Sequence, residues 1–154
     1  MLKQVQQAFA EQGALSKAID GFKAREPQKL MAASVTKSIE NGNALLVEAG
    51  TGTGKTYAYL VPALLSGKKV ILSTGTKNLQ EQLYFRDLPT VLKALALPVD
   101  TSLLKGRSNY LCLFRLDQHY QHVPTADAAV INDLSLIKKW SNETQSGDIG
   151  ELTY

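Results

Sequence analysis

The sequence lacks most of the features that mark secreted or membrane proteins. Its 154 residues contain one cysteine and one tryptophan. A single cysteine excludes a disulfide within the chain and leaves the redox compartment open, with a reducing cytosol as the default expectation. The opening stretch, MLKQVQQAFAEQG, has no long apolar run, which argues against a signal peptide or a membrane-spanning helix there. We therefore expect a cytoplasmic protein with no membrane partner.

The composition is that of a globular domain with a small excess of positive charge. Hydrophobic residues make up 44% of the chain and charged residues 20%, with a formal net charge of +3. This length suits one compact domain. The mildly basic balance permits nucleic-acid binding but does not by itself predict it.

Short apolar runs alternate with helical patterns in the first two thirds of the chain. Helices are predicted over 2–12, 27–41, 55–65 and 76–88, with a further short helix opening at Pro89. Three apolar runs bounded by glycine or proline read as buried strands, at 43–49, 68–74 and 98–106. This alternation predicts an α/β fold with a parallel sheet. Beyond residue 108 only helices are predicted, over 109–121 and 125–145.

The stretch AGTGTGKT fits the pattern of a phosphate-binding loop, with a predicted strand before it and a predicted helix after it. Backbone N–H groups of such loops form a concavity that cradles phosphates. Lys55 would reach the β- and γ-phosphates, and the Thr56 hydroxyl would bind Mg²⁺. A glycine-rich turn with a chance lysine is the alternative. The candidate nucleotide-binding residues are Ala49, Gly50, Thr51, Gly52, Thr53, Gly54, Lys55 and Thr56.

Three further stretches accompany this loop: FKAREPQKLM, STGTKNLQEQL and KGRSNYLC. With EAGTGTGKT, they resemble the DinG/YoaA group of superfamily-two DNA helicases, bacterial relatives of the XPD-type iron–sulphur helicases. The resemblance runs from about Phe22 to the last residue. It implies the first part of a RecA-like P-loop motor domain over 1–107, followed over 108–154 by the start of a helical iron–sulphur insertion. It also implies that the chain is an N-terminal part of a longer helicase.

The resemblance assigns roles to residues outside the phosphate loop. In these helicases an Arg-x-x-Gln element reads the adenine edge, which implies that role for Gln28, with Arg25 supporting the element. A glutamine amide carries both the donor and the acceptor that adenine requires. A solvated helix start is the alternative. STGTKNLQEQL resembles the element that holds single-strand phosphates, which implies DNA contacts from Thr74 and Thr76; for Thr76 the alternative is helix capping alone.

The stretch KGRSNYLC holds the single cysteine. In the family such a stretch delivers the first of four cysteine ligands of a [4Fe–4S] cluster, which implies that Cys112 is one ligand and that the others lie beyond residue 154. One thiolate cannot hold a cluster. A buried free thiol is the alternative. A zinc site from Cys112, His119 and His122 lacks a fourth ligand, and about 10 Å of helix separates the first two.

The resemblance implies a 5′-to-3′ DNA helicase of DNA repair that uses Mg-ATP to move along single-stranded or forked DNA. The family also uses an Asp-Glu-x-His motif and a second motor domain. The sequence contains neither. We therefore expect these residues alone to bind nucleotide weakly and not to unwind DNA. Two other functions stay open: a small P-loop kinase or NTPase, and a non-enzymatic ATP-binding module.

Overall fold

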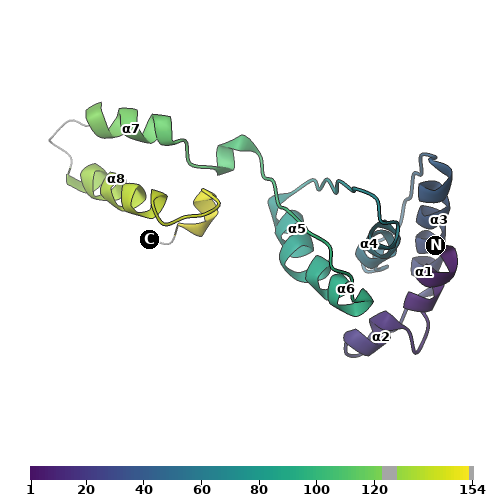
Figure 1. Cartoon of the computed structure of the whole chain (residues 1–154). Coiled ribbons are helices and arrows are strands. Elements are labelled where there is room, and N and C mark those ends of the chain that lie inside the picture. The colour runs from purple at the N-terminus through teal and green to yellow at the C-terminus, as the bar shows by residue number, and fades with distance from the viewer. Residues whose placement is uncertain (123–127, 153–154) are drawn as a thin grey trace. The chain divides into compact units, whose positions relative to one another are not determined.

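Figure 1 shows the computed structural model, which describes residues 1–122 and 128–152. The chain forms two compact units, Met1–Ser102 and Leu103–Tyr154. Every regular element longer than an isolated bridge is helical within the described residues.

The first unit is a set of helices around one apolar core. Phe9, Leu15, Leu60 and Val91 are among its fully buried side chains. Phe22 lies between Phe9 and Tyr57, with ring centroids 6.5 and 6.0 Å away. The elements are α1 (Leu2–Ala8), α2 (Ala14–Ala18), α3 (Glu26–Asn41), α4 (Lys55–Leu65), α5 (Lys77–Gln82), the π-helix η1 (Leu83–Asp87) and α6 (Leu88–Leu95).

Capping residues set the ends of several helices where the sequence predicts them. Pro27 lies in the first turn of α3, and Gly42 ends that helix with a φ of 69°. A positive φ of this size favours glycine, which has no Cβ. The Thr76 hydroxyl accepts a hydrogen bond from the Leu79 N–H at 3.3 Å and so caps α5. The helix predictions for these segments are confirmed.

The predicted parallel sheet is wrong. Residues 43–49, 68–74 and 98–106 have no regular secondary structure, and none of them belongs to a strand in the described chain. Leu46 is 98% exposed and Ile71 is 90% exposed, so these runs are not buried. A strand requires backbone hydrogen bonds to a neighbouring strand. A short apolar run indicates only that the segment is hydrophobic and does not show that such a neighbour exists. The described fold is therefore helical, with irregular connections, and not an α/β sheet of the RecA-like type.

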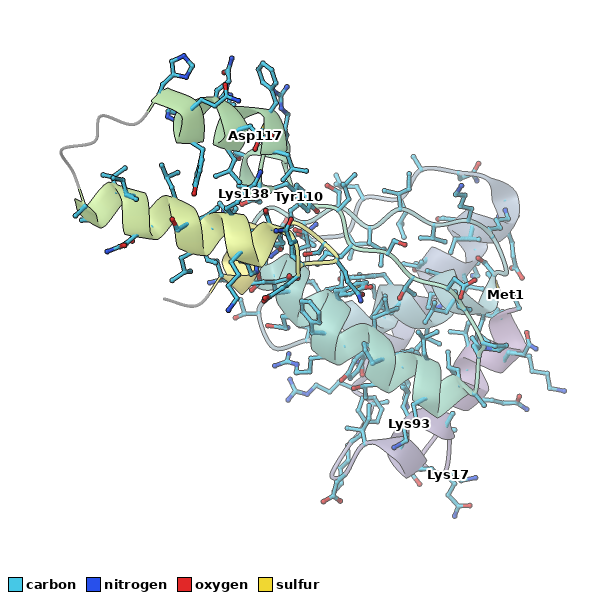
Figure 2. The ribbon with its side chains drawn as sticks, turned by 60° about the vertical axis from the view of Figure 1, so that its left-hand side comes forward. Met1, Lys17, Lys93, Tyr110, Asp117 and Lys138 are labelled. Carbon is cyan, nitrogen blue, oxygen red and sulfur yellow. The ribbon has the colours of Figure 1, made fainter. Side chains whose placement is uncertain are left out.

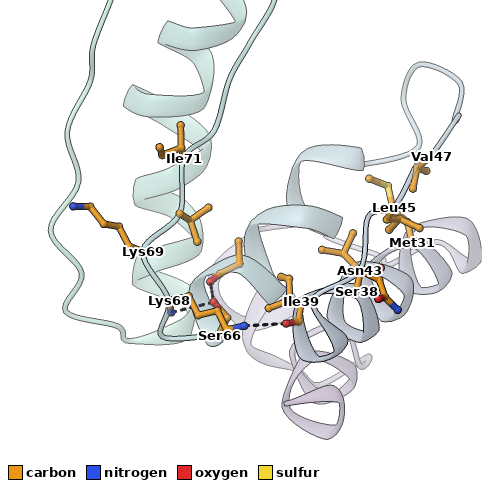
Figure 3. A pocket seen from close by; sticks show the side chains of 14 residues that line it. Met31, Ser38, Ile39, Asn43, Leu45, Val47, Ser66, Lys68, Lys69 and Ile71 are labelled. Atoms are coloured by element: carbon orange, nitrogen blue, oxygen red, sulfur yellow. Dashed lines mark hydrogen bonds between the residues drawn. The ribbon is translucent and has the colours of Figure 1, made fainter.

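An apolar pocket of about 590 Å³ is lined by α3, the end of α4 and the irregular segments 43–49 and 68–74 (Figure 3). Its apolar lining includes Met31, Ile39, Leu45, Val47, Val70 and Ile71. At its edge the Lys68 ammonium donates to the Ile39 carbonyl oxygen at 3.0 Å. The phosphate-loop residues are not part of this lining, so the pocket is separate from the nucleotide-binding candidates.

The second unit pairs two helices, α7 (Leu113–His122) and α8 (Ala128–Ser141). Asp117 and Lys138 form an ion pair between them, and Figure 2 shows the two side chains close together. Short 3₁₀ turns precede and follow the pair, η2 (Arg107–Asn109) and η3 (Ile149–Glu151). Both predicted helices are confirmed in their central parts, although residues 125–127 of the second prediction lie outside the described residues.

In the part of the chain that the structure describes, none of the helices combines the length and apolar character needed to cross a bilayer.

Candidate nucleotide-binding site

The phosphate loop connects the irregular segment 43–49 to the start of α4. Gly52 and Gly54 have φ angles of 76° and 80°, in the left-handed region that glycine adopts without strain. Gly54 is the N-cap of α4, and its carbonyl oxygen accepts the first helical hydrogen bond, from Ala58 N–H at 3.2 Å. The loop therefore leads directly into the N-terminus of a helix, where backbone N–H groups and the helix dipole favour an anion.

The Lys55 side chain folds back over the loop. Its Nζ donates to the carbonyl oxygens of Ala49 and Gly50, each at 2.7 Å. These two bonds hold a positive charge within the loop. A cation at the N-terminus of a helix is an arrangement that attracts phosphate oxygens, which would have to exchange with the carbonyls.

The threonines of the loop differ in what they contact. The Thr53 hydroxyl donates to the Gly50 carbonyl oxygen at 3.0 Å and so tightens the turn. Thr51 is exposed. Thr56 is half-buried in the first turn of α4. Burial raises the pKa of Tyr59, and its hydrogen bond with the Thr56 side chain opposes that rise.

The Arg-x-x-Gln element and the phosphate loop come together. Arg25 Nη1 donates to the Gly52 carbonyl oxygen, and Gln28 Nε2 donates to the Gly54 carbonyl oxygen at 3.0 Å. Gln28 is 4% exposed, which contradicts the alternative of a solvated helix start for this residue. The loop thus receives side chains from α3 as well as from α4.

The two threonines expected to contact DNA form local hydrogen bonds at the start of α5. Thr74 Oγ1 donates to the Thr76 carbonyl oxygen at 3.2 Å, and the Thr76 hydroxyl caps α5 as an acceptor. Thr76 is exposed. Because a hydroxyl that accepts one hydrogen bond can still donate its own proton, the capping role leaves Thr76 a donor.

Cys112 is exposed and lies immediately before α7. Its carbonyl oxygen accepts a hydrogen bond from Leu116 N–H at 2.9 Å. The alternative of a buried thiol is therefore wrong. In residues 1–122 and 128–152, no three His, Cys, Asp or Glu side chains come together as a metal site, so Cys112, His119 and His122 do not form such a group. One thiolate does not fit a [4Fe–4S] cluster without ligands from elsewhere.

Comparison with known proteins identifies the family. The model of the DEAD/DEAH box helicases matches residues 29–147, which include the phosphate loop. The chain belongs to the DEAD/DEAH box helicase family. The matched range begins at residue 29 and so does not include Gln28. The contact of Gln28 with the loop is an observation from the structure.

Within this family, the chain is similar in sequence to curated proteins named YoaA and DinG. It is 60% identical to the ATP-dependent DNA helicase YoaA of Escherichia coli K12, over 92% of this chain and 22% of that protein. It is 39% identical to the ATP-dependent helicase DinG of Mycobacterium tuberculosis H37Rv, over 99% of this chain and 26% of the relative. A protein named 3'-5' exonuclease DinG, from Bacillus subtilis 168, is 38% identical over 90% of this chain and 15% of its own length.

The chain thus spans about a quarter or less of the length of these relatives. The search of solved structures gives no match.

Sequence reasoning missed a buried carboxylate next to α4. Asp87 is 4% exposed and accepts hydrogen bonds from Arg86 Nε at 2.9 Å and Gln82 Nε2 at 3.1 Å. Burial, followed by the charge of Asp87, raises the pKa of Tyr57, and Arg86 opposes that rise. The only sequence signal was the charged pair itself, which would ordinarily be assigned to a helix surface.

Sequence reasoning also missed an ion pair that holds the segment before Cys112. The Lys105 ammonium lies 2.6 Å from the Asp148 carboxylate, and their side chains are 8% and 12% exposed. Tyr110 and Asp148 form an isolated antiparallel bridge, and Leu111 N–H donates to the Gly147 carbonyl oxygen at 2.8 Å. The segment KGRSNYLC is therefore fixed to the stretch around Gly147.

Proposed function

We propose that the whole protein containing this sequence is an ATP-dependent DNA helicase. It couples hydrolysis of Mg-ATP to movement along single-stranded or forked DNA, 5′-to-3′, in DNA repair in the cytoplasm. One observation carries the nucleotide part: Lys55 and Gln28, from different helices, both bond to carbonyls of one glycine-rich loop. In this proposal, Lys55 supplies the cation for phosphate and Gln28 supplies the amide for adenine. The names of the relatives support the DNA part.

In this proposal, binding begins with an exchange at Lys55. The triphosphate replaces the carbonyl oxygens of Ala49 and Gly50 as partners of the ammonium, and loop N–H groups donate to phosphate oxygens. Magnesium, when bound, neutralises charge on those oxygens. The hydroxyl of Thr56, in the first turn of α4, would be its ligand from this chain.

Gln28 has the capacity to bond to the loop and to adenine together. One of its N–H bonds donates to the Gly54 carbonyl oxygen. The amide has a second N–H and a carbonyl oxygen, which form the donor and acceptor pair that an adenine edge accepts. The base would therefore lie beside the loop, with the phosphates directed toward Lys55.

DNA contacts are assigned to Thr74 and Thr76. Both hydroxyls are neutral donors suited to phosphate oxygens, which position a strand without reading its sequence. Thr76 would donate its proton while its oxygen continues to cap α5. Thr74 would have to exchange its bond with the Thr76 carbonyl oxygen for one to DNA.

Cys112 is proposed as one thiolate ligand of an iron–sulphur cluster whose other ligands lie outside this sequence. The exposed position of the residue before α7 supports the proposal, because a ligand has to be reachable by its metal. Iron and sulphide analysis of the anaerobically purified whole protein tests it. Cys112→Ser should lower the bound iron, and an unchanged iron content would contradict the assignment.

Steady-state hydrolysis of ATP by the whole protein, with and without single-stranded DNA, tests the main proposal. We expect DNA to stimulate hydrolysis, the protein to unwind a 5′-tailed duplex, and Lys55→Ala to abolish both activities. Equal turnover without DNA would favour a standalone kinase or NTPase. Absence of turnover would favour a non-enzymatic module. The 154 residues by themselves are predicted to bind nucleotide without unwinding DNA.

A further inference from the structure

The carbonyl groups of the phosphate loop are held by different parts of the chain. Those of Ala49 and Gly50 accept hydrogen bonds from Lys55, at the end of the loop itself. That of Gly54 accepts one from the α4 backbone and one from Gln28. The Gly52 carbonyl accepts one from Arg25, which is 27 residues away in sequence.

The bond to Gly52 fixes the direction of a neighbouring N–H group. In a planar trans peptide the C=O and the following N–H point in opposite directions. A donor that holds the Gly52 carbonyl on the Arg25 side therefore directs the N–H of Thr53 to the other side of the loop. Phosphates bound by loop N–H groups would lie on that other side.

The contact of Arg25 can also persist when nucleotide binds. The ammonium of Lys55 has to leave Ala49 and Gly50 in order to reach phosphate oxygens. The Ala49 carbonyl then loses this donor, and the Gly50 carbonyl keeps only the hydrogen bond from the Thr53 hydroxyl. Arg25 bonds to a carbonyl that Lys55 does not use. A Cβ at position 52 would lie 3.9 Å from Arg25 Nη1, an ordinary contact distance, so the φ of 76° and not a lack of space favours glycine there.

We propose that Arg25 is a positioning residue that orients the phosphate loop through the Gly52 carbonyl before nucleotide arrives. This inference rests on the proposed nucleotide site. It differs from a direct contact between the guanidinium and ATP, because the bond acts in the nucleotide-free protein. It also differs from adenine recognition, because it affects every ligand that the loop binds through phosphate.

The experiment compares wild type with Arg25→Met, and with Lys23→Met as the matched loss of one exposed positive charge. Backbone ¹⁵N relaxation of glycine-labelled, nucleotide-free protein reports the order of Gly52 and Gly54. Calorimetry measures the binding of ATP and of inorganic tripolyphosphate to the same samples.

For Arg25→Met we expect the order parameters of these glycines to fall from about 0.85 to below about 0.6. Affinity for ATP and for tripolyphosphate should fall by the same factor, on the order of ten, as for a lost hydrogen bond from a charged group. Lys23→Met should leave all three quantities unchanged.

Two results would overturn the inference. Unchanged order in the free loop, with both affinities reduced, would make Arg25 a direct phosphate contact. Weaker binding of ATP with unchanged binding of tripolyphosphate would indicate that Arg25 contacts the adenine base and not the phosphate loop. Absence of ATP binding by wild type would contradict the proposed nucleotide site instead, and the relaxation of the free loop would still test the role of Arg25.

Discussion

The amide of Gln28 occupies space that only a glycine at position 54 leaves open. Gln28 Nε2 lies 3.0 Å from the Gly54 carbonyl oxygen, and a Cβ on residue 54 would lie 2.2 Å from the same nitrogen. The φ of Gly54, 80°, is also strained for any residue with a Cβ. The backbone conformation therefore favours glycine where the loop enters α4, and a Cβ there would force the Gln28 amide to move.

Gly54→Ala should displace Gln28 and strain the loop. We expect ATP affinity to fall at least ten-fold and the free energy of unfolding to fall by about 1–2 kcal/mol, from the left-handed backbone alone. Calorimetry and urea unfolding measure the two effects. Gly75→Ala is the matched control, because a Cβ there meets nothing within 4 Å. Equal losses in the two variants would contradict this account of Gly54.

Substitutions at Thr76 separate helix capping from DNA contact. Aspartate is a good N-cap but repels phosphate, so Thr76→Asp should keep the stability of the first unit while weakening single-stranded DNA binding. Thr76→Ala should cost about 1 kcal/mol of unfolding free energy through the lost cap. Fluorescence anisotropy with labelled DNA measures the binding. Undiminished DNA affinity of Thr76→Asp would leave Thr76 with capping as its only role.

Alkaline pH should destabilise the first unit through two tyrosines. Burial raises the pKa of Tyr57 and Tyr59. A group whose pKa is higher in the folded state contributes stability below its unfolded pKa, about 10, and that contribution disappears as pH rises through the folded pKa. The free energy of unfolding should therefore decrease above about pH 10. Replacing both tyrosines by phenylalanine should flatten this decrease in urea titrations, and an unchanged slope would rule out their part in it.

The ion pair between Lys105 and Asp148 should contribute far more to the second unit than the exposed pair of Asp117 and Lys138. Removing one partner of a buried pair typically costs about 3–5 kcal/mol, because the other charge is left buried. Exposed pairs contribute about 0–1 kcal/mol. We therefore expect Lys105→Met to be strongly destabilising and Lys138→Met to be nearly neutral in thermal unfolding. Similar melting temperatures for the two variants would contradict this ranking.

Local signals in the sequence predicted the helices and the loop because each depends on residues close together in the chain. Gly42 and Thr76 mark helix ends through their own backbone and hydroxyl groups. The pattern around Lys55 likewise predicts a loop before a helix. The Arg-x-x-Gln resemblance suggested a role near nucleotide for Gln28, but its bond to Gly54 emerges only when α3 and α4 pack together.

Features that depend on distant partners could not be predicted in the same way. The apolar runs around Leu46 and Ile71 predicted strands that the structure does not form. Strand pairing depends on a neighbouring strand, and the sequence within one run does not specify that neighbour. The pairing of Lys105 with Asp148 joins opposite ends of the second unit. No pattern in the sequence around either residue predicts that the two side chains form an ion pair.

The most direct test of the nucleotide site is calorimetric titration of the purified protein with Mg-ATP, compared with Lys55→Ala and Gln28→Ala. The account predicts that wild type binds ATP more tightly than GTP, that Lys55→Ala loses affinity for both, and that Gln28→Ala loses the preference for ATP. Unchanged ATP affinity in Lys55→Ala would contradict it.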